Sequence, residues 1–497
     1  MDTSQHRELE DSPNIEGLNL LTIKGAVNLR KDNMYQKNGE GKQIKLFNPN
    51  GEPIGSEAGG TGNATETGDE LSSRLKQQRT LTGNILERIV DYGNLNKAYQ
   101  QVRANKGSSG VDGMNVEDLR HWLGLHLTEL QESILNGQYQ VNTIQKVEIP
   151  KPGGGVRMLG IPTVKDRLIQ QAIQQEMNRY YEPYFSDHSY GFRIGRSAGQ
   201  AIQQASEYIA EGKEWVVDID LEKFFDKINH DRLMQRLSKG IGDKRLLRLI
   251  NAYLKAGIMA DGLTEQRTEG TPQGSPLSPL LSNIVLDELD KELEKRRLSF
   301  CRYADDCNIF VRSRKAGERV LKSLTDFIER KLKLKVNAAK SGVRHCSDIN
   351  FLGYTVMPGA KIRVADKSID RLKAKLKEFS RRNRGVKFEQ IIKELNAVIL
   401  GWTNYFRLAN SWLTTFRELD EWLRRRLRCY RLKQCGRKYT TFKFLRNFGI
   451  DVNTCWNVVM YSGGWWNMSQ KPAVGKAMNV QWFAQVGLQS LQVRMSR

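Results

Sequence analysis

Four aspartates stand in pairs at the ends of short apolar runs. Asp218 and Asp220 close the run WVVDID, and Asp305 and Asp306 lie between the two apolar runs of FCRYADDCNIFV. Adjacent carboxylates repel each other, so such a pair costs stability unless a cation compensates. Mg²⁺ takes carboxylate oxygens as ligands, and phosphoryl transfer uses such ions to activate the attacking oxygen and neutralise the leaving group. These aspartates are therefore candidates for a metal-dependent phosphoryl-transfer site.

A plainer interpretation is that Asp305 and Asp306 only make a tight turn, because Asp is common in turns. That interpretation would suffice for an isolated pair. Here a second acidic strand end lies upstream, and the segment TPQGSPLSPLLSNI lies between the two pairs. The combination favours a site over a simple turn.

Short elements are predicted around these aspartates. Residues 148–164 contain two apolar runs on either side of a Gly-rich turn, which predicts a hairpin because Pro and Gly exclude a helix there. Apolar residues at a helical period predict one or two helices over 81–102 and another over 166–181. The apolar runs 215–219, 300–303 and 308–311 predict strands of a central sheet that carries both acidic turns.

Basic residues dominate the last part of the chain. The sequence has 78 Lys and Arg against 56 Asp and Glu, a formal net charge of +22. From Lys361 onward there are 28 basic and 9 acidic residues, so 28 − 9 = +19 of the excess lies there. A solvated face usually mixes both signs, whereas a region of one sign attracts a polyanion. We therefore expect nucleic acid as a partner.

The six cysteines form no C-x-x-C pair, and the polar start MDTSQHRELE does not resemble a leader. No apolar run reaches the length of about 18 residues that a membrane span requires. The sequence therefore predicts a reduced, cytoplasmic protein without a membrane partner.

Several motifs together resemble the ordered motif blocks of group II intron reverse transcriptases. They are LGIPTVKDR, SYGFR, DIDLEKFFDKINH, TPQGSPLSP and YADD, and the resemblance runs from about Asn94 to Arg497. Several motifs in one order are a far more specific signal than any one of them.

The resemblance implies an RNA-directed DNA polymerase with catalytic residues Asp220, Asp305 and Asp306. It implies a two-metal site for Mg²⁺, with Mn²⁺ as a substitute, at Asp220, Leu221, Asp305 and Asp306. Asp218 lies two residues from the family position and remains the alternative to Asp220.

The resemblance also implies residues that bind the incoming dNTP. Lys151 and Arg157 would hold its triphosphate, Phe225 would crowd the sugar 2′ position, Gln273 would lie under the nascent base pair, and Lys340 would protonate the leaving pyrophosphate. The plainer interpretations are a solvated hairpin tip for Lys151 and Arg157, core packing for Phe225, and a solvent-facing side chain for Lys340.

Nucleic-acid contacts are expected at two further places. Arg193 in SYGFR and Gly353 in FLGYTV, which resembles the hairpin that grips the primer, are one group. The other is the arginine run of the basic helix ending near Arg431, where Arg424, Arg425 and Arg428 would contact phosphates.

The predicted fold is α+β, a right-hand polymerase. We expect a poorly ordered extension over 1–78, fingers and a palm with an antiparallel sheet over 79–360, an α-helical thumb or maturase domain X over 361–435, and a C-terminal maturase segment over 436–497. No H-N-H endonuclease follows, which implies priming from nascent strands or single-stranded DNA.

Intron RNA, target DNA and dNTPs are the implied partners, in a bacterial cytoplasm at the nucleoid or in an organelle. Two alternatives remain open. One is a splicing factor that binds RNA with an inactive polymerase site, which the intact aspartates disfavour. The other is a domesticated polymerase in host defence or repair.

Overall fold

The structure is a computed structural model that describes residues 84–150, 155–260, 263–410 and 413–496. The predicted extension over 1–78 lies outside the described residues. The chain divides into two compact units. The first comprises the described residues up to Ser197 together with Ile219–Cys307 and Leu321–Ser341, and the second comprises Ala198–Asp218, Asn308–Val320 and the chain from Gly342 onward.

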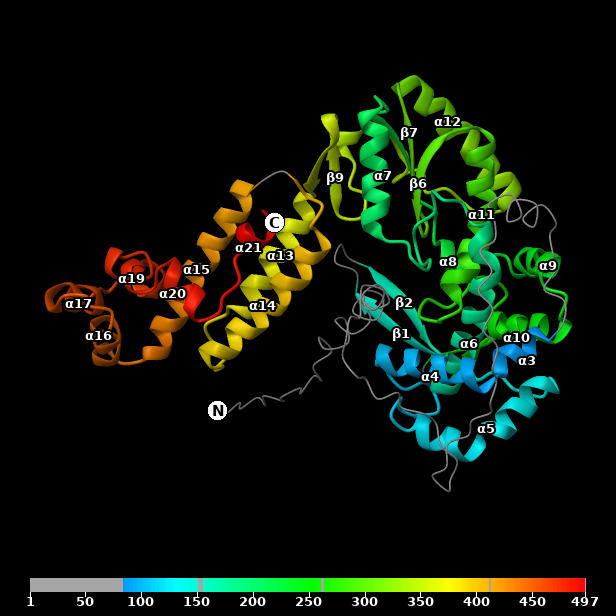
Figure 1. Ribbon diagram of the computed structural model, residues 1–497, viewed down its shortest axis with the longest axis horizontal. Coiled ribbons are helices and arrows are strands. Elements are labelled where there is room, and N and C mark those ends of the chain that lie inside the picture. Colours follow the sequence, from blue (N-terminus) through cyan, green and yellow to red (C-terminus); the bar gives the residue numbers. More distant parts are fainter. Residues whose placement is uncertain (1–83, 151–154, 261–262, 411–412, 497) are drawn as a thin grey trace, which may run out of the picture. The chain divides into compact units, whose positions relative to one another are not determined.

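The first unit contains a group of helices, one of which lies at its centre. They are α3 (Ile85–Val90), α4 (Tyr92–Asn105), α5 (Leu119–Leu135), α6 (Val164–Tyr181), α8 (Phe224–Lys227), α9 (His230–Gly240), α10 (Lys244–Lys255) and α11 (Ser278–Lys295), with the short turns η2 (Glu182–Tyr184) and η3 (Ile328–Leu332). In α6 the side chains of Leu168, Ile169 and Ala172 are fully buried. Helices α3 and α4 pack on α6 (Figure 1), so α6 is the core of this unit.

Helix α6 begins where the sequence supplies a cap. Thr163 accepts a hydrogen bond from the Asp166 backbone N–H at 3.2 Å and donates its hydroxyl to the Asp166 carboxylate at 2.7 Å. The first of these bonds satisfies one of the backbone donors that the first helical turn leaves open, and the second holds the two side chains together. The cap fixes where the chain turns from the preceding hairpin into α6.

The predicted hairpin over 148–164 is confirmed. Strands β1 (Ile144–Pro150) and β2 (Val156–Ile161) pair antiparallel with Ile149 opposite Arg157. The sequence missed β4 (Ile258–Ala260) and β5 (Leu263–Glu265), which complete a sheet in the order β2-β1-β4-β5, with β4 parallel to β1.

The predicted central sheet is also confirmed, and it has one strand more than predicted. Its order is β6-β7-β3-β8, formed by β6 (Ser299–Tyr303), β7 (Asp306–Val311), β3 (Trp215–Ile219) and β8 (Gly342–His345). Strand β8 pairs antiparallel with β3, with Asp218 opposite Gly342. Helix α12 (Arg314–Phe327) follows β7 along the chain.

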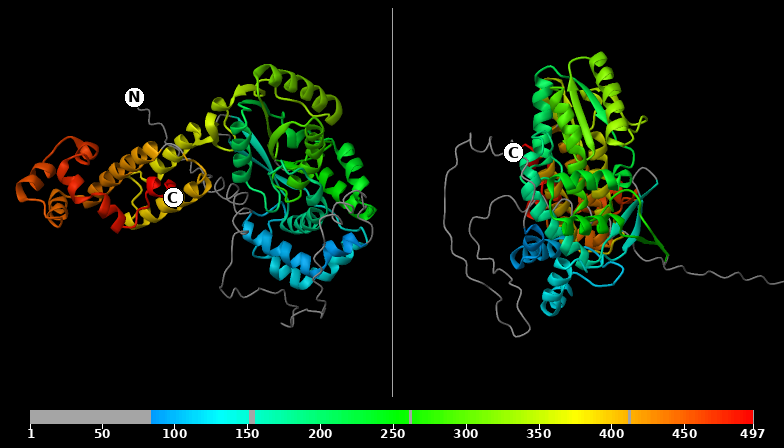
Figure 2. Two further views of the ribbon diagram at one scale, coloured as in Figure 1. Left: turned by 45° about the horizontal axis from the view of Figure 1, so that its top comes forward. Right: turned by 90° about the vertical axis from the view of Figure 1, so that its right-hand side faces the viewer.

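In the second unit, the chain beyond residue 361 is helical, as the sequence predicts, except for β10, which begins at residue 361. Besides β8 and most of β3 and β7, this unit contains α7 (Ala198–Ala210), η4 (Cys346–Asp348), the hairpin β9 (Tyr354–Met357), η5 (Pro358–Ala360) and β10 (Lys361–Val364), then α13 (Asp366–Phe379), α14 (Phe388–Tyr405), α15 (Leu413–Cys435), α16 (Lys438–Arg446), α17 (Val452–Val459), α18 (Gly464–Met468), α19 (Pro472–Ala477), α20 (Val480–Gln485) and α21 (Leu491–Met495). Helices α13, α14 and α15 lie side by side (Figure 1), and α16, α17 and α19 form a separate group at the end of α15 (Figure 2).

A buried carboxylate ties the end of the chain to α15. Asp420, which is 4% exposed, accepts hydrogen bonds from the Ser490 hydroxyl at 2.6 Å and from the backbone N–H groups of Leu491 at 3.0 Å and Gln492 at 3.2 Å. A negative charge at the first turn of α21 is favourable because the helix N-terminus carries partial positive charge.

In the part of the chain that the structure describes, no helix has both the length and the apolar character needed to cross a membrane.

Candidate active site

Asp220 follows β3 directly, and a loop from far along the chain holds its backbone. Its N–H donates to the Ser341 hydroxyl at 2.9 Å, and its carbonyl accepts from the Asn337 N–H at 2.8 Å. A further bridge pairs Leu221 with Val336. The carboxylate of Asp220 is thus presented from a backbone that is fixed on both sides.

Asp305 lies on the tight turn between β6 and β7. The preceding residue, Ala304, has a left-handed backbone with φ of 58°, a conformation that non-glycine residues rarely adopt. Gly191 of SYGFR lies against this turn so closely that a Cβ there would be 2.3 Å from the Ala304 nitrogen. The glycine therefore lets the SYGFR segment support the turn.

Arg302 joins this turn to two other segments, and it is completely buried. Its guanidinium forms a two-pronged ion pair with Asp290 at 2.7 and 2.6 Å, and donates to the Ala304 carbonyl at 2.8 Å. It also donates to Ser189 at 2.7 Å and Asn283 at 3.0 Å.

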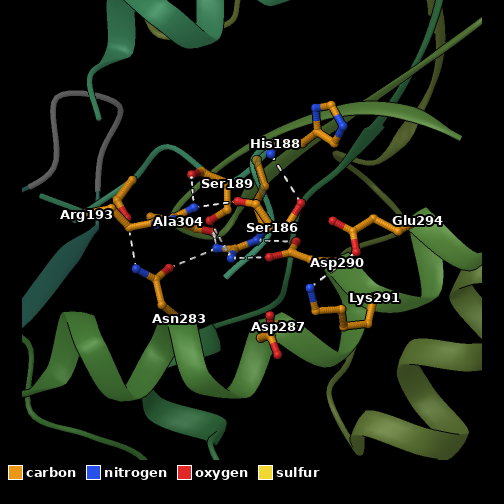
Figure 3. Close-up of polar contacts among 12 residues, drawn as sticks. Ser186, His188, Ser189, Arg193, Asn283, Asp287, Asp290, Lys291, Glu294 and Ala304 are labelled. Atoms are coloured by element: carbon orange, nitrogen blue, oxygen red, sulfur yellow. Dashed lines mark hydrogen bonds and ion pairs between the residues drawn. The ribbon is translucent and has the colours of Figure 1, made fainter. Parts of the chain in front are cut away.

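Figure 3 shows Asn283 and Asp290 on one helix, α11, with Ser189 and Ala304 facing them. Buried charges occur in proteins when they are paired and hydrogen-bonded. The sequence reasoning missed Arg302, although a charge inside the apolar run FCRY was a signal that a buried partner must exist.

The electrostatics of the turn depend on Asp220. Burial raises the pKa of Asp305 above its usual range, and the negative charge of Asp220 raises that pKa further. A backbone N–H and the cations Arg157 and Arg302 act in the opposite direction. The negative charge of Asp220 therefore acts on Asp305, and a cation near both carboxylates would offset that repulsion.

Lys340 lies beside the same carboxylate. Its Nζ is 3.6 Å from Oδ2 of Asp220, and its side chain is 67% exposed. The structure thus brings together Asp220, Asp305 and Lys340, as the sequence led us to expect.

Two further aspartates remain, the predicted ligand Asp306 and Asp218, which was the alternative to Asp220. Their surroundings differ. Asp306 begins β7 and is exposed. Asp218 accepts a hydrogen bond from Arg344 of β8 at 2.9 Å, whereas the charge of Asp220 raises the pKa of Asp305. These contacts favour Asp220 over Asp218 as the partner of Asp305.

Of the two predicted triphosphate-binding residues, Arg157 is on β2, exposed, and close enough to lower the pKa of Asp305. Lys151 lies outside the described residues. Phe225 is half-buried and meets Phe224 edge-on at 5.3 Å, while Phe224 itself is only 2% exposed. Core packing therefore falls to Phe224, and Phe225 retains accessible surface.

The TPQGSP loop packs under the β1–β2 hairpin. The carbonyl of the half-buried Gln273 accepts from the Gly160 N–H of β2 at 2.9 Å. Gly274 has φ of 117°, and a Cβ there would lie 2.8 Å from the Gly160 carbonyl oxygen. Glycine is needed at this position both for its backbone conformation and for this close approach.

Arg193 was expected to contact nucleic acid, but its side chain is only 3% exposed. Its guanidinium pairs with Glu182 at 2.8 Å and donates to the carbonyls of Ser186 at 2.5 Å and Ser189 at 2.9 Å. These contacts correct the expectation, because a guanidinium engaged in this way holds the SYGFR loop together. Gly353, with φ of 83°, precedes β9 and packs against Phe406.

The predicted RNA contacts of the arginine run on α15 also need revision. Arg425 lies over the Trp466 ring at 3.6 Å, and Arg428 donates to the Met478 carbonyl at 3.0 Å. Both therefore connect α15 to the helices that follow it. Arg424 is half-buried on the same helix, and its contact with RNA stays a prediction.

The donor chemistry at Asp220 and Asp305 fits a hard divalent ion, because both donors are carboxylates and their mutual repulsion is relieved by a cation. Among the described residues no group of three or more His, Cys, Asp or Glu is gathered tightly enough to hold a metal by itself. The fit therefore rests on two carboxylates, and Mg²⁺ is commonly held by one or two carboxylates together with oxygens of a substrate.

Comparisons with known proteins agree with this geometry. Residues 149–356 match the family described as reverse transcriptase (RNA-dependent DNA polymerase), and residues 369–449 match the group II intron, maturase-specific domain. The protein YkfC of Escherichia coli is 34% identical over 50% of this chain and 75% of its own length.

The group II intron-encoded protein LtrA of Lactococcus lactis is 33% identical over 48% of this chain and 38% of its own. A putative COX1/OXI3 intron 2 protein of Saccharomyces cerevisiae is 26% identical over 58% of this chain and 40% of its own. The chain thus spans less than half the length of these two intron-encoded relatives.

The fold and the family match over residues 149–356 define the class as a reverse transcriptase. With the maturase domain that follows, the chain belongs to the reverse transcriptases of group II introns.

Proposed function

We propose that this chain copies intron RNA into DNA by target-primed reverse transcription and acts as a maturase on the same RNA. The observation that carries the polymerase is the approach of Asp220 to Asp305, with Arg157 and Lys340 beside them. Divalent metal use is general in this family. We assign Mg²⁺ to Asp220, Asp305, Asp306 and Leu221. Leu221 would contribute its backbone carbonyl, because its side chain has no oxygen.

In the proposed reaction the primer 3′-hydroxyl releases its proton to water, and its oxygen bonds to the α-phosphorus of a dNTP while the bond to pyrophosphate breaks. Bound metal would lower the cost of charge on the attacking and leaving oxygens. Arg157 binds the triphosphate through its guanidinium. Lys340, which is exposed beside Asp220, gives a proton to the departing pyrophosphate.

The choice of deoxynucleotide is assigned to Phe225. Its half-buried ring is backed by the buried ring of Phe224 at 5.3 Å, which limits how far it can move away from a sugar. A 2′-hydroxyl would then meet the ring, and a clash of this kind rejects the wrong substrate. Gln273, held to Gly160 through its carbonyl, supports the base pair being formed.

The maturase role is assigned to the second unit, where the match to the maturase-specific domain lies. Its excess of basic charge favours binding of intron RNA, and target DNA is the second nucleic-acid partner. Because LtrA comes from a bacterium, we propose a bacterial cytoplasm, at the nucleoid, as the place of action.

Primer extension on an RNA template with Mg²⁺ and dNTPs tests this proposal. We expect the wild type to extend the primer and Asp305→Asn to lose activity by roughly a thousand-fold or more, because a carboxamide cannot replace a charged ligand. Asp326→Asn, at an exposed position on α12, is the matched control and should extend normally. Extension by Asp305→Asn would refute the site. Failure of the wild type, with tight RNA binding retained, would leave only the splicing role.

A further inference from the structure

A cavity of about 950 Å³ lies within the second unit, and its lining includes none of the candidate active-site aspartates. It is bordered by the C-terminal half of α13 and the segment after it, by the middle of α15, and by α18. Its lining combines cations and large aromatic rings, and includes Lys373, Lys377, Arg381, Arg382, Arg426, Lys433, Trp422, Trp465 and Trp466. We call it the maturase cavity.

The charge of the maturase cavity is almost all of one sign. Six of its lining residues are Lys or Arg, and Asp370 is its one acidic residue, giving 6 − 1 = +5. Among the residues that the structure describes, none of these six cations forms an ion pair within 4.0 Å. A cluster of uncompensated cations in a concave site concentrates field and attracts an anion.

Arg426 is held rigidly at the wall of the cavity. Its Nε donates to the Ser380 hydroxyl at 2.7 Å, and Nη2 donates to the carbonyl of Lys377 at 3.0 Å at the end of α13. These bonds do not use Nη1. Burial lowers the pKa of Arg426, and the nearby charges of Arg382 and Arg381 lower it further, so an anion here would relieve both effects.

The aromatic walls are fixed by contacts of their own. The guanidinium of Arg425 stacks on the Trp466 ring at 3.6 Å, and the Cys429 thiol donates to the Trp465 carbonyl at 3.1 Å. Trp466 is nevertheless 37% exposed. A ring that is supported on one side and open on another is suited to stacking with a flat partner.

We infer that the maturase cavity binds an unpaired nucleotide of single-stranded RNA, with the phosphate on Arg381, Arg382 and Arg426 and the base on Trp466. A free phosphate would need the cations but not the rings. A duplex keeps its bases stacked inside, whereas proteins that read single strands stack splayed bases on aromatic side chains beside a basic groove. The choice of RNA rests on the proposed function.

The test is equilibrium binding of the full chain to a fluorescent single-stranded RNA of 12 nucleotides, compared with a duplex of the same sequence, at several salt concentrations. Trp466→Ala should weaken single-strand binding roughly 5- to 100-fold, the range for loss of one base stack, and should change duplex binding much less. Trp456→Ala is the matched control, because Trp456 is 40% exposed and lies outside the cavity. Trp466→Phe should recover part of the loss.

The phosphate contacts have a separate readout. The double variant Arg381→Ala, Arg382→Ala should lower the slope of log K against log salt by up to about 0.7, because the cavity holds one phosphate and each single-strand phosphate contact contributes about 0.7. Arg417→Ala, an exposed cation on α15 outside the cavity, should leave the slope unchanged. Equal losses in Trp466→Ala and Trp456→Ala, or losses that are the same for duplex and single strand, would overturn the inference.

A loss seen with single-stranded DNA but not with RNA would overturn the assignment to RNA. Binding and primer extension are separate measurements. A chain that does not extend a primer but distinguishes Trp466 from Trp456 would keep this inference and lose the polymerase.

Discussion

At the scale of single residues, Arg302 has the clearest effect on the turn that carries Asp305. Its guanidinium donates a hydrogen bond to the Ala304 carbonyl, and its ion pair with Asp290 fixes it to α11. Ala304 is held in a left-handed backbone conformation, which costs energy unless neighbouring structure supports it. We therefore regard Arg302 as a positioning residue for Asp305.

Two variants separate positioning from simple stability. Arg302→Met leaves the Asp290 carboxylate buried and unpaired, so we expect a loss of about 3–5 kcal/mol in the free energy of unfolding. Adding Asp290→Leu removes the unpaired charge and should recover much of the thermal midpoint. Extension should nevertheless remain low in the double variant, because the bond to the Ala304 carbonyl is still missing. Normal extension by the double variant would show that Arg302 serves the ion pair alone.

Sequence reasoning can point to residues whose motif carries chemistry, but it misses those that act through distant contacts. Asp220 and Asp305 stand out because they lie in the motifs DIDLEKFFDKINH and YADD. Ser341 supports the backbone of Asp220 from 121 positions away, and nothing local to Ser341 indicates that contact. For Arg425 and Arg428, the sequence indicates charge but not which faces of α15 are covered by later helices.

At the scale of elements, helices α9 and α11 are joined by charged side chains. Arg236 of α9 pairs with Asp287 at 2.8 Å and with Glu288 at 2.5 Å. Despite its ion pair, burial raises the pKa of Asp287 to about 6, and one of its oxygens, Oδ1, is buried without a hydrogen-bond partner among the described residues. Burial therefore raises the pKa of Asp287 by more than the charge of Arg236 lowers it.

This raised pKa predicts a pH dependence. The folded chain keeps a proton on Asp287 up to about pH 6, whereas the unfolded chain releases it near the ordinary value of 3.8. Stability from this group is therefore present at pH 4 and is lost as the pH rises through 6. Asp287→Asn cannot titrate, so the thermal midpoint of the wild type minus that of the variant should fall by several degrees between pH 4 and pH 7. A difference that stays constant or rises would contradict the burial argument.

The elements that the sequence predicted well are those with a strong local pattern. The hairpin of β1 and β2 has Gly-rich punctuation, and β3, β6 and β7 are apolar runs next to acidic turns. Strands β4 and β5 have three residues each and become strands only by pairing with β1 and with each other. A run that short has no period of its own to detect.

At the scale of the whole molecule, the candidate metal-binding aspartates and the excess of basic residues lie in different units. Asp220, Asp305 and Asp306 belong to the first unit, whereas the maturase cavity and the basic excess beyond residue 361 belong to the second. The nearly neutral remainder, +22 − 19 = +3, includes the carboxylates of the proposed catalytic site. This division agrees with a polymerase joined to a separate RNA-binding region.

The most direct test of the central claim compares two aspartates that are two positions apart. Single-turnover addition of one dNTP to a primer on an RNA template should fall roughly a thousand-fold in Asp220→Asn, because the charge of that carboxylate acts on Asp305 in the proposed metal site. Asp218→Asn should lose no more than about ten-fold, because its carboxylate pairs with Arg344 at 2.9 Å. The opposite order, with Asp218→Asn inactive and Asp220→Asn active, would contradict the site described here.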